Sequence, residues 1–213
     1  MELLHEKDGK LIQSDEELYV AFWLAELKEA GYVKEYQLQP APFRLSEDIM
    51  FSWTKDTSTK TIKNRSEQKY SCMLEGKIYT PDVRVVWNES ARNIFYTINI
   101  PQSNKCKLLI AHHKFNAIFE EVEAVSYIEV KPHFDQNNME REFKINQKWV
   151  YQAHNTFVNL VVPNKFFPYN FTPQQCIDTM VYVKQTTTKK RGIKYKGDSK
   201  ITWTVKTLKE YTK

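Results

Sequence analysis

The chain has 213 residues, of which 41% are hydrophobic, 14% aromatic and 27% charged. This composition is typical of a globular protein with room for one domain and an extension. The net charge of +5 is compatible with a nucleic-acid partner but does not require one. Three widely spaced cysteines argue against a disulfide scaffold and against a zinc ribbon, and they fit a reducing compartment. No membrane-spanning apolar run and no secretory signal are visible, so we expect a cytoplasmic protein.

The first well-defined element is a helix over residues 15–30. Ser14 and Glu17 have the spacing of a capping box, in which each side chain satisfies a backbone amide of the other residue. Gly31 suits the cap at the other end, because glycine adopts the left-handed conformation without strain. An alternating strand follows over residues 32–40 and ends at proline.

Two β-rich stretches carry the residues on which the functional interpretation depends. In residues 126–132, Glu129 and Lys131 fall on one face of a strand, and the aliphatic residues fall on the other. Asp82 begins the second stretch, residues 82–87. If the two strands pair, Asp82 and Glu129 converge and form a hard-oxygen site that suits Mg²⁺. The neighbouring amine of Lys131 could orient a water molecule or stabilise a phosphate in the transition state.

The remaining elements are predicted from periodicity and turn residues. The polar, basic stretch 54–65 is expected to be a loop or a mobile hairpin. Residues 73–80 are expected to pair with residues 82–87 as a hairpin, and residues 116–125 could be helical or extended. Further strands are expected at 93–100, 108–115 and 155–162, and further helices at 139–153 and 172–183.

Pro81-Asp82 followed by Glu129-Val130-Lys131 resembles the motif of the PD-(D/E)xK nuclease superfamily. Residues 14–43 are also similar to the start of phage nucleases related to Holliday-junction resolvases, through Ser14, Glu17, Glu26-Leu27-Lys28, Gly31, Gln39-Pro40 and Phe43. The resemblance implies the α/β restriction-endonuclease-like fold, with a mixed central sheet flanked by helices. It also implies a nuclease core over residues 1–165, with an insertion at about 101–125, and a basic C-terminal extension over residues 166–213 that contacts DNA.

The function implied by the resemblance is that of a Mg²⁺-dependent endodeoxyribonuclease that hydrolyses phosphodiester bonds in branched or otherwise structured DNA. Mn²⁺ would substitute for Mg²⁺, and a homodimer in a phage-infected or prokaryotic cell would cut two strands. The implied metal ligands are Glu17, Asp82, Glu129 and the backbone carbonyl of Val130. Lys131 would complete the catalytic set. Two alternatives stay open at the first helix: Glu16 could replace Glu17, and Glu17 could serve only as a helix cap.

Candidate DNA contacts fall on two segments. Lys144, Gln147 and Lys148 share a face of the expected helix 139–153, where they could equally be surface residues of an amphipathic helix. The segment 184–197 interleaves cations with a tyrosine, a pattern that suits a phosphate backbone and a stacked base. Its candidate contacts are Lys189, Lys190, Arg191, Lys194, Tyr195 and Lys196.

Several alternatives to this interpretation remain open. Asp82 and Glu129 lie 47 positions apart, so a metal site built from Glu120, Glu121 and Glu123 is an alternative. The chain could also be a TnsA-type endonuclease subunit that cleaves transposon ends, or a non-catalytic DNA-binding protein that retains the nuclease fold. The absence of a Gly-rich phosphate loop and of a Gly-x-Ser-x-Gly elbow argues against P-loop hydrolysis and serine acyl transfer.

Overall fold

The fold is described from a computed structural model of the chain. The structure describes the backbone of residues 5–7, 10–12, 14–59, 62–99, 108–132, 139–177, 183–190, 193–200 and 205–213, and the side chains of residues 12, 14–56, 66–99, 108–132, 141–177 and 205–213. The strands are β1 (His5–Lys7), β2 (Lys10–Ile12), β3 (Val33–Leu38), β4 (Phe43–Arg44), β5 (Ile49–Thr59), β6 (Ile62–Leu74), β7 (Ile78–Tyr79), β8 (Val83–Trp87), β9 (Tyr96–Thr97), β10 (Leu109–Ile110), β11 (His112–Asn116), β12 (Glu121–Val130), β13 (Val158–Val161), β14 (Val183–Lys190) and β15 (Ile193–Lys200). The helices are α1 (Asp15–Glu29), α2 (Met139–His154), α3 (Pro163–Phe166), α4 (Gln174–Ile177) and α5 (Leu208–Tyr211), with 3₁₀ turns η1 (Glu89–Ala91) and η2 (Phe167–Tyr169).

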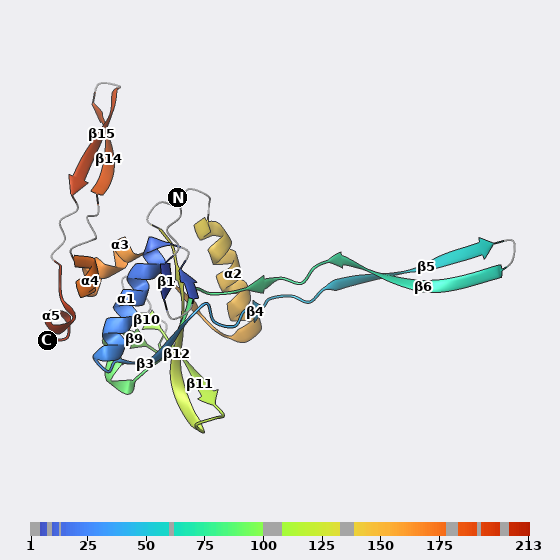
Figure 1. The fold of residues 1–213 in the computed structure, drawn as a ribbon, viewed down its shortest axis with the longest axis horizontal. Coiled ribbons are helices and arrows are strands. Elements are labelled where there is room, and N and C mark those ends of the chain that lie inside the picture. The colour runs from blue at the N-terminus through green and yellow to red at the C-terminus, as the bar shows by residue number, and fades with distance from the viewer. Residues whose placement is uncertain are drawn as a thin grey trace.

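A five-stranded, predominantly antiparallel sheet forms the centre of the molecule (Figure 1). Its middle strand is β12, which pairs with β8 along one edge. Along its other edge β12 pairs first with β11, in antiparallel fashion, and then with β13, in parallel. The strand β3 extends the sheet beyond β8. The two strands that carry the predicted site are therefore neighbours, as expected.

Helices cover both faces of this sheet. On one face α1 packs against alternate residues of the strands, among them Val85 and Ile128, which are fully buried. On the other face α2 packs Phe143 and Val150 against the start of β13, where Val158 is fully buried. The expected mixed α/β class is thus found, although the parallel share of the sheet is limited to the β12–β13 pair.

The helix α1 begins after Ser14 and ends before Gly31, as its sequence predicts, and the serine half of the expected capping box is present. The Ser14 hydroxyl oxygen accepts a hydrogen bond from the backbone N–H of Glu17 at 3.2 Å. At the other end Gly31 has φ of 78°, and the N–H groups of Gly31 and Tyr32 donate to the carbonyls of Lys28 and Leu27. This pair of bonds is a Schellman motif, which satisfies the last carbonyls of the helix.

A long two-stranded ribbon, formed by β5 and β6, extends away from the body (Figure 1). We call residues 49–74 the arm. The stretch 54–65, expected to be a loop or a hairpin, belongs to its outer part. The strand expected at 73–80 is divided between two pairs, since β6 ends at Leu74 and β7 pairs with β4. It does not pair with 82–87, because a tight hairpin requires positive φ in the turn, and neither Thr80 nor Pro81 has it.

The other predicted elements differ from the structure mainly in length. Of the expected strand 93–100, the described part forms a strand only at β9, which pairs in parallel with β10. The strand expected at 108–115 is divided into β10 and β11, and residues 121–130 are extended rather than helical. The helix expected at 172–183 is found only at Gln174–Ile177 within the residues that the structure describes, and Val183 already belongs to β14.

The C-terminal part of the chain returns to the main core. Phe167 and Phe171, beyond the expected domain boundary at residue 165, belong to the same buried cluster as the residues of α1. Leu208 of α5 joins the same cluster, and Tyr211 packs on Phe95 with ring centroids 5.5 Å apart. The basic segment between them forms a second ribbon, β14–β15. No helix in the described ranges is long and apolar enough to cross a membrane.

Candidate active site

Asp82 and Glu129 lie across from each other at the ends of two neighbouring strands. The antiparallel register pairs Val83 with Ile128, so the next position along each strand places Asp82 opposite Glu129. The Asp82 Oδ2 atom accepts a hydrogen bond from the backbone N–H of Val130 at 2.6 Å. The contact from Val130 is therefore made by its N–H group, whereas the sequence interpretation assigned its carbonyl to the metal.

The Glu129 side chain is buried and held at both carboxylate oxygens. The Tyr79 hydroxyl donates a hydrogen bond to Oε2 at 2.6 Å, and the Lys131 ammonium lies 2.7 Å from Oε1. Because Glu129 and Lys131 are two residues apart on a strand, their side chains emerge on the same face and can form this ion pair. Tyr79 reaches Glu129 from β7, since β7 lies on the α2 side of the sheet with Phe143 and Val158.

Glu17 of α1 lies close enough to act on this site through its charge. It raises the pKa of Asp82 and contributes to raising the pKa of Lys131. Glu16 does not act on either group and instead raises the pKa of Tyr19. Glu17 also accepts a hydrogen bond from the Ser14 hydroxyl at 3.2 Å, so capping and proximity to the site occur in the same residue. Of the two glutamates, Glu17 is the one whose charge reaches Asp82 and Lys131.

Burial and negative charge together determine the ionisation of Asp82. Burial raises its pKa most, the charge of Glu129 raises it further, and the hydrogen bond from Val130 opposes them, which leaves the pKa at about 7. For Lys131, burial lowers the pKa, but the hydrogen bond to Glu129 and the charges of Glu129 and Asp82 outweigh it and raise the pKa. The site therefore holds the protonated Lys131 beside three carboxyl groups, those of Glu17, Asp82 and Glu129, whose combined negative charge exceeds that of one ammonium.

The fit of these residues to a divalent cation is chemical rather than geometric. Glu17, Asp82 and Glu129 offer the hard oxygen ligands that Mg²⁺ prefers, and a cation would relieve the repulsion that raises the pKa of Asp82. Over the residues that the structure describes, however, no group of three or more His, Cys, Asp or Glu side chains is arranged to hold a metal ion. Glu129 would have to exchange its contact with Tyr79 or Lys131 for the ion.

The three candidate DNA contacts on α2 differ in whether their side chains are free to meet a ligand. Lys144 and Lys148 are exposed. The Gln147 side chain donates a hydrogen bond to the backbone carbonyl of Val158 at 2.6 Å, which ties α2 to β13. Gln147 therefore has a structural contact in place, whereas the two lysines are accessible to a ligand. Through this bond α2 lies against β13, the strand whose Leu160 pairs with Glu129 on β12.

The second group of DNA candidates lies on the β14–β15 ribbon. Lys189 and Lys190 end β14, and Lys194, Tyr195 and Lys196 lie on β15, while Arg191 and the side chains of the whole group lie outside the described residues. Residues 183–200 hold seven of the 31 Lys and Arg residues and one of the 26 Asp and Glu residues of the chain. The rest of the chain has 24 basic and 25 acidic residues, so this ribbon carries the whole surplus of positive charge.

The alternative metal site at Glu120, Glu121 and Glu123 is explained by ion pairs. Lys34 pairs with both Glu121 and Glu123, and Arg84 lies 3.8 Å from Glu123. Glu123 is buried, because these two cations cover it. A metal ion would have to displace both cations. His112 is engaged as well, since its Nε2 atom accepts the backbone N–H of Phe157 at 2.7 Å.

Tyr79 is the site residue that the sequence interpretation missed. It lies three residues before Asp82, in a stretch that was expected to pair with residues 82–87 rather than to face Glu129. Its burial and the charge of Glu129 raise its pKa, so it remains a hydrogen-bond donor at neutral pH. A tyrosine so close to the Pro81-Asp82 motif was the available signal.

Comparisons of the chain with family models, curated proteins and solved structures gave no match.

Proposed function

We propose that the protein is a Mg²⁺-dependent endodeoxyribonuclease with a restriction-endonuclease-like core, acting on branched or otherwise structured DNA. The observation that carries the proposal is the grouping of Glu17, Asp82, Glu129 and Lys131 from one helix and two central strands. In the sequence these residues span more than half of the chain; the β8–β12 register brings Asp82 to Glu129, and α1 brings the charge of Glu17 within reach of Asp82 and Lys131.

The electrostatics of the group support a cation-binding role. Carboxylates that are partly buried beside one another are costly, because each disfavours the ionised form of its neighbour. The structure retains them although, within the described part of the chain, Lys131 is the one cation that acts on Asp82. A divalent cation bound by Glu17, Asp82 and Glu129 would balance these charges, and when bound it would polarise a phosphodiester and lower the pKa of a bound water.

The residues of the chain have distinct parts in this proposal. Lys131 is fixed by Glu129 at 2.7 Å and remains protonated, so it can stabilise negative charge that develops on a phosphate or orient a water for attack. Tyr79 fixes the other oxygen of Glu129 and thereby its direction. The Val130 N–H fixes Asp82. These are positioning contacts of the kind that keep a reacting group within a narrow range of geometry.

The charge distribution supports DNA as the substrate. The β14–β15 ribbon concentrates seven basic residues in a stretch of 18, and a ribbon of this kind can follow a phosphate backbone. The exposed Lys144 and Lys148 on α2 add positive charge on the body. We therefore assign initial DNA binding to the ribbon and cleavage to the residues around Asp82.

The test compares cleavage of supercoiled plasmid and of a synthetic four-way junction in Mg²⁺, in Mn²⁺ and in EDTA. We expect metal-dependent cleavage that Asp82→Asn and Lys131→Met each reduce by at least about 100-fold. The matched control is Glu121→Gln, which removes an exposed carboxylate from the same strand β12 and should leave cleavage within about twofold. Full activity in both site variants would refute the proposal.

A second candidate, DNA binding without cleavage, is favoured by one observation. Both oxygens of Glu129 and one oxygen of Asp82 already have partners within the protein, and no described cluster has metal-holding geometry. This candidate predicts tight junction binding that EDTA does not affect and no cleavage in either metal. Calorimetric titration of the protein with Mn²⁺ separates the two, since only the nuclease should show a heat that Asp82→Asn abolishes.

A further inference from the structure

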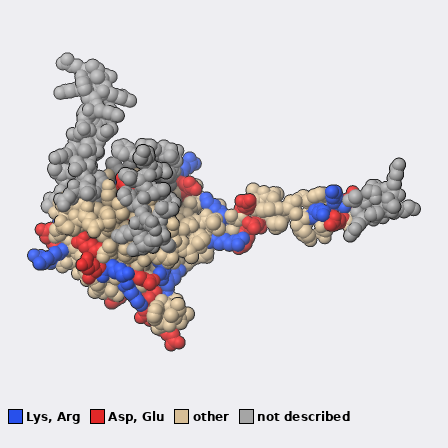
Figure 2. Space-filling model, viewed as in Figure 1, with Lys and Arg blue, Asp and Glu red and all other residues tan. Residues whose placement is uncertain are grey.

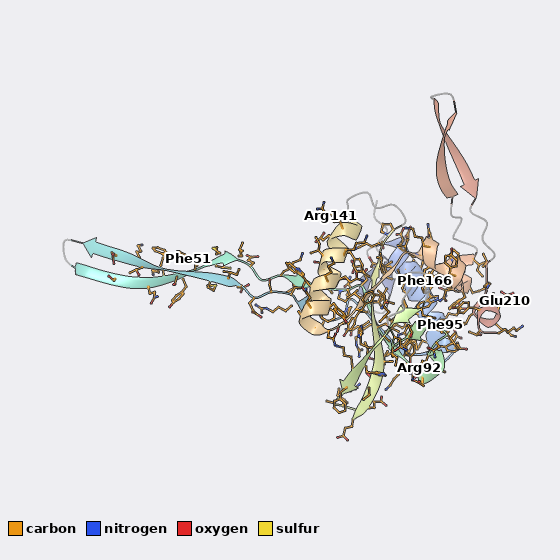
Figure 3. All side chains as sticks on the ribbon, turned by 180° about the vertical axis from the view of Figure 1, so that it is seen from behind. Phe51, Arg92, Phe95, Arg141, Phe166 and Glu210 are labelled. Atoms are coloured by element: carbon orange, nitrogen blue, oxygen red, sulfur yellow. The ribbon has the colours of Figure 1, made fainter. Side chains whose placement is uncertain are left out.

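The inner half of the arm, residues 49–53 and 70–74, exposes an unusual number of large apolar side chains. Seven of them are 41% to 65% exposed, and these described residues do not belong to either core cluster. Figure 2 shows this half as a mostly uncharged stretch between the body and a group of charges further out, and Figure 3 labels Phe51 on it. The seven are Ile49, Met50, Phe51, Trp53, Tyr70, Met73 and Leu74.

These side chains occupy both faces of the ribbon. Cross-strand partners share a face, and the register pairs Phe51 with Ser71 and Ser52 with Tyr70. Phe51 and Trp53 therefore lie on one face, and Met50 and Tyr70 lie on the other. A ribbon that is apolar on one face can bury its side chains against a single surface. A ribbon that is apolar on both faces must be covered on both before all its apolar side chains are removed from solvent.

The arm is not expected to remain uncovered. A two-stranded ribbon without a third strand or a helix is marginally stable in water, and its outer edges offer unpaired backbone groups. The partner of the inner half is a protein rather than a nucleic acid, because residues 49–53 and 70–74 contain no charged side chain that could pair with phosphates. The basic residues of the arm lie further out, over residues 55–69, where Lys69 is 2.9 Å from Glu67.

The apolar surface continues from the arm onto the body. At the root of the arm the Lys77 ammonium lies 5.5 Å from the ring centroid of Trp149 on α2. Trp149 is 41% exposed, and Ile145, one helical turn before it, is also exposed. Ile78 on β7 is exposed next to the same root. Each copy of the chain thus carries both an apolar ribbon and, beside its root, an apolar strip on the body.

We propose that two copies of this chain pair by exchanging arms about a two-fold axis near the arm roots. One face of each inner half contacts the partner's arm, and the other face covers the partner's strip around Trp149. Seven side chains about half exposed would bury roughly 100 Å² each, or about 1,400 Å² over two copies. This is the size of a stable interface, and the polar outer part of each arm would form its rim.

The test is the oligomeric state of the full chain, measured by sedimentation velocity and light scattering at micromolar concentration. We expect a mass twice the 25.3 kDa of one chain. Two double variants should each raise the dissociation constant of the dimer by at least about 10-fold. They are Phe51→Ser with Trp53→Ser and, separately, Met50→Ser with Tyr70→Ser. The control is Phe115→Ser with Ile118→Ser on the β11–β12 hairpin, where the two side chains are 69% and 86% exposed, more than those of the arm, and it should remain dimeric.

Cross-linking gives a second measurement that does not depend on weakened association. Cys72 is exposed and pairs with Met50 in the inner half, so a short bismaleimide should join two copies in a Cys106→Ser background. Adding Cys72→Ser should abolish this product. A monomeric wild type overturns the proposal, as does a dimer that survives both arm variants. So does a dimer that is lost only in the Phe115/Ile118 control. None of these readouts depends on cleavage, so failure of the nuclease assignment would leave them unaffected.

Discussion

Asp82 shows how a single position can link the stability of the fold to the proposed chemistry. Its carboxyl group is partly buried and faces Glu129, and both effects disfavour its ionised form. The unfolded chain has neither effect, so the same group ionises there near its ordinary pKa of 3.8. The folded state therefore keeps a proton on Asp82 over a pH range in which the unfolded state has released it.

This difference predicts that stability decreases as pH rises from about 4 to about 7. Over that range the folded state binds more protons than the unfolded state, so the free energy of unfolding falls with pH. The total decrease attributable to Asp82 should be roughly 2 to 4 kcal/mol. Urea unfolding of the wild type and of Asp82→Asn between pH 4.5 and 8 measures it, and the variant should have a flatter profile. Equal slopes would show that Asp82 does not carry this linkage.

The face assignment of β12 is the residue-scale feature that could be predicted most fully. Strict alternation predicted that Ile128 and Val130 would be buried on one face while Glu129 and Lys131 shared the other, and the core clusters and the ion pair confirm it. The contact from Tyr79 could not be predicted, because it depends on where β7 lies relative to the sheet. That placement results from the pairing of β7 with β4, a contact between residues far apart in the sequence.

At the scale of an element, the first turn of α1 offers a clean comparison of two neighbouring carboxylates. Glu17 acts on Asp82 and Lys131 through its charge, whereas Glu16 acts on Tyr19. We predict that Glu17→Gln lowers metal-dependent cleavage by about 10-fold or more and raises the Mg²⁺ concentration needed for half-maximal rate. Glu16→Gln should change both by less than about twofold.

Thermal unfolding provides the control for this pair. Glutamine can still accept the hydrogen bond from the Ser14 hydroxyl, so both variants should stay within about 0.5 kcal/mol of the wild type in stability. A Glu17→Gln variant with unchanged cleavage would assign Glu17 to capping alone. If Glu16→Gln lost activity instead, the roles of the two residues would be reversed.

The elements that were predicted well are those with local signals. The helix α1 has its cap residues within the sequence that forms it, and α2 has a long amphipathic pattern, so both were found within about one residue of their ends. The arm was expected only as a loop or hairpin over 54–65, because its inner apolar residues resemble those of an ordinary core strand. What the sequence does not express is that these residues lie outside the body.

At the scale of the whole molecule, the chain segments before and after the β14–β15 ribbon lie next to each other. The backbone N–H of Thr172 donates to the carbonyl of Lys206 at 2.9 Å, so the chain on either side of the ribbon is held together. We predict that replacing residues 178–204 with a short Gly-Ser linker leaves the melting temperature within a few degrees of the wild type. DNA affinity should fall by at least about 10-fold and lose part of its salt dependence.

Two measurements check this prediction, a thermal melt and fluorescence anisotropy with a labelled junction at several salt concentrations. The matched control replaces Lys144 and Lys148 by glutamine, which removes two exposed charges from the body without changing the chain path. Its salt slope should change by about two at most. Unchanged affinity after removal of the ribbon would transfer the DNA-binding role elsewhere, and a large loss of stability would show that the ribbon supports the core.

The residues beyond position 165 combine a basic ribbon with aromatic residues that pack into the main core. Phe167 and Phe171 are as buried as Trp23 of α1. Trp23 explains why, since its ring packs against Phe166 and Phe171 and its indole N–H donates to Asn170. A single tryptophan on the first helix thus requires residues about 150 positions later, a dependence that no local pattern shows.

The position of Leu208 in the cluster around α1 has a consequence for how the protein is made. A ribosome that adds roughly 5 to 20 residues per second needs about 10 to 35 s to travel from the end of α1 to Leu208. Throughout that interval Trp23 and its apolar neighbours on the nascent chain lack the packing contact of Leu208 and remain partly exposed to solvent. Chaperone occupancy on translating ribosomes should accordingly persist until the final few dozen codons, and prematurely terminated products should be recovered as insoluble material.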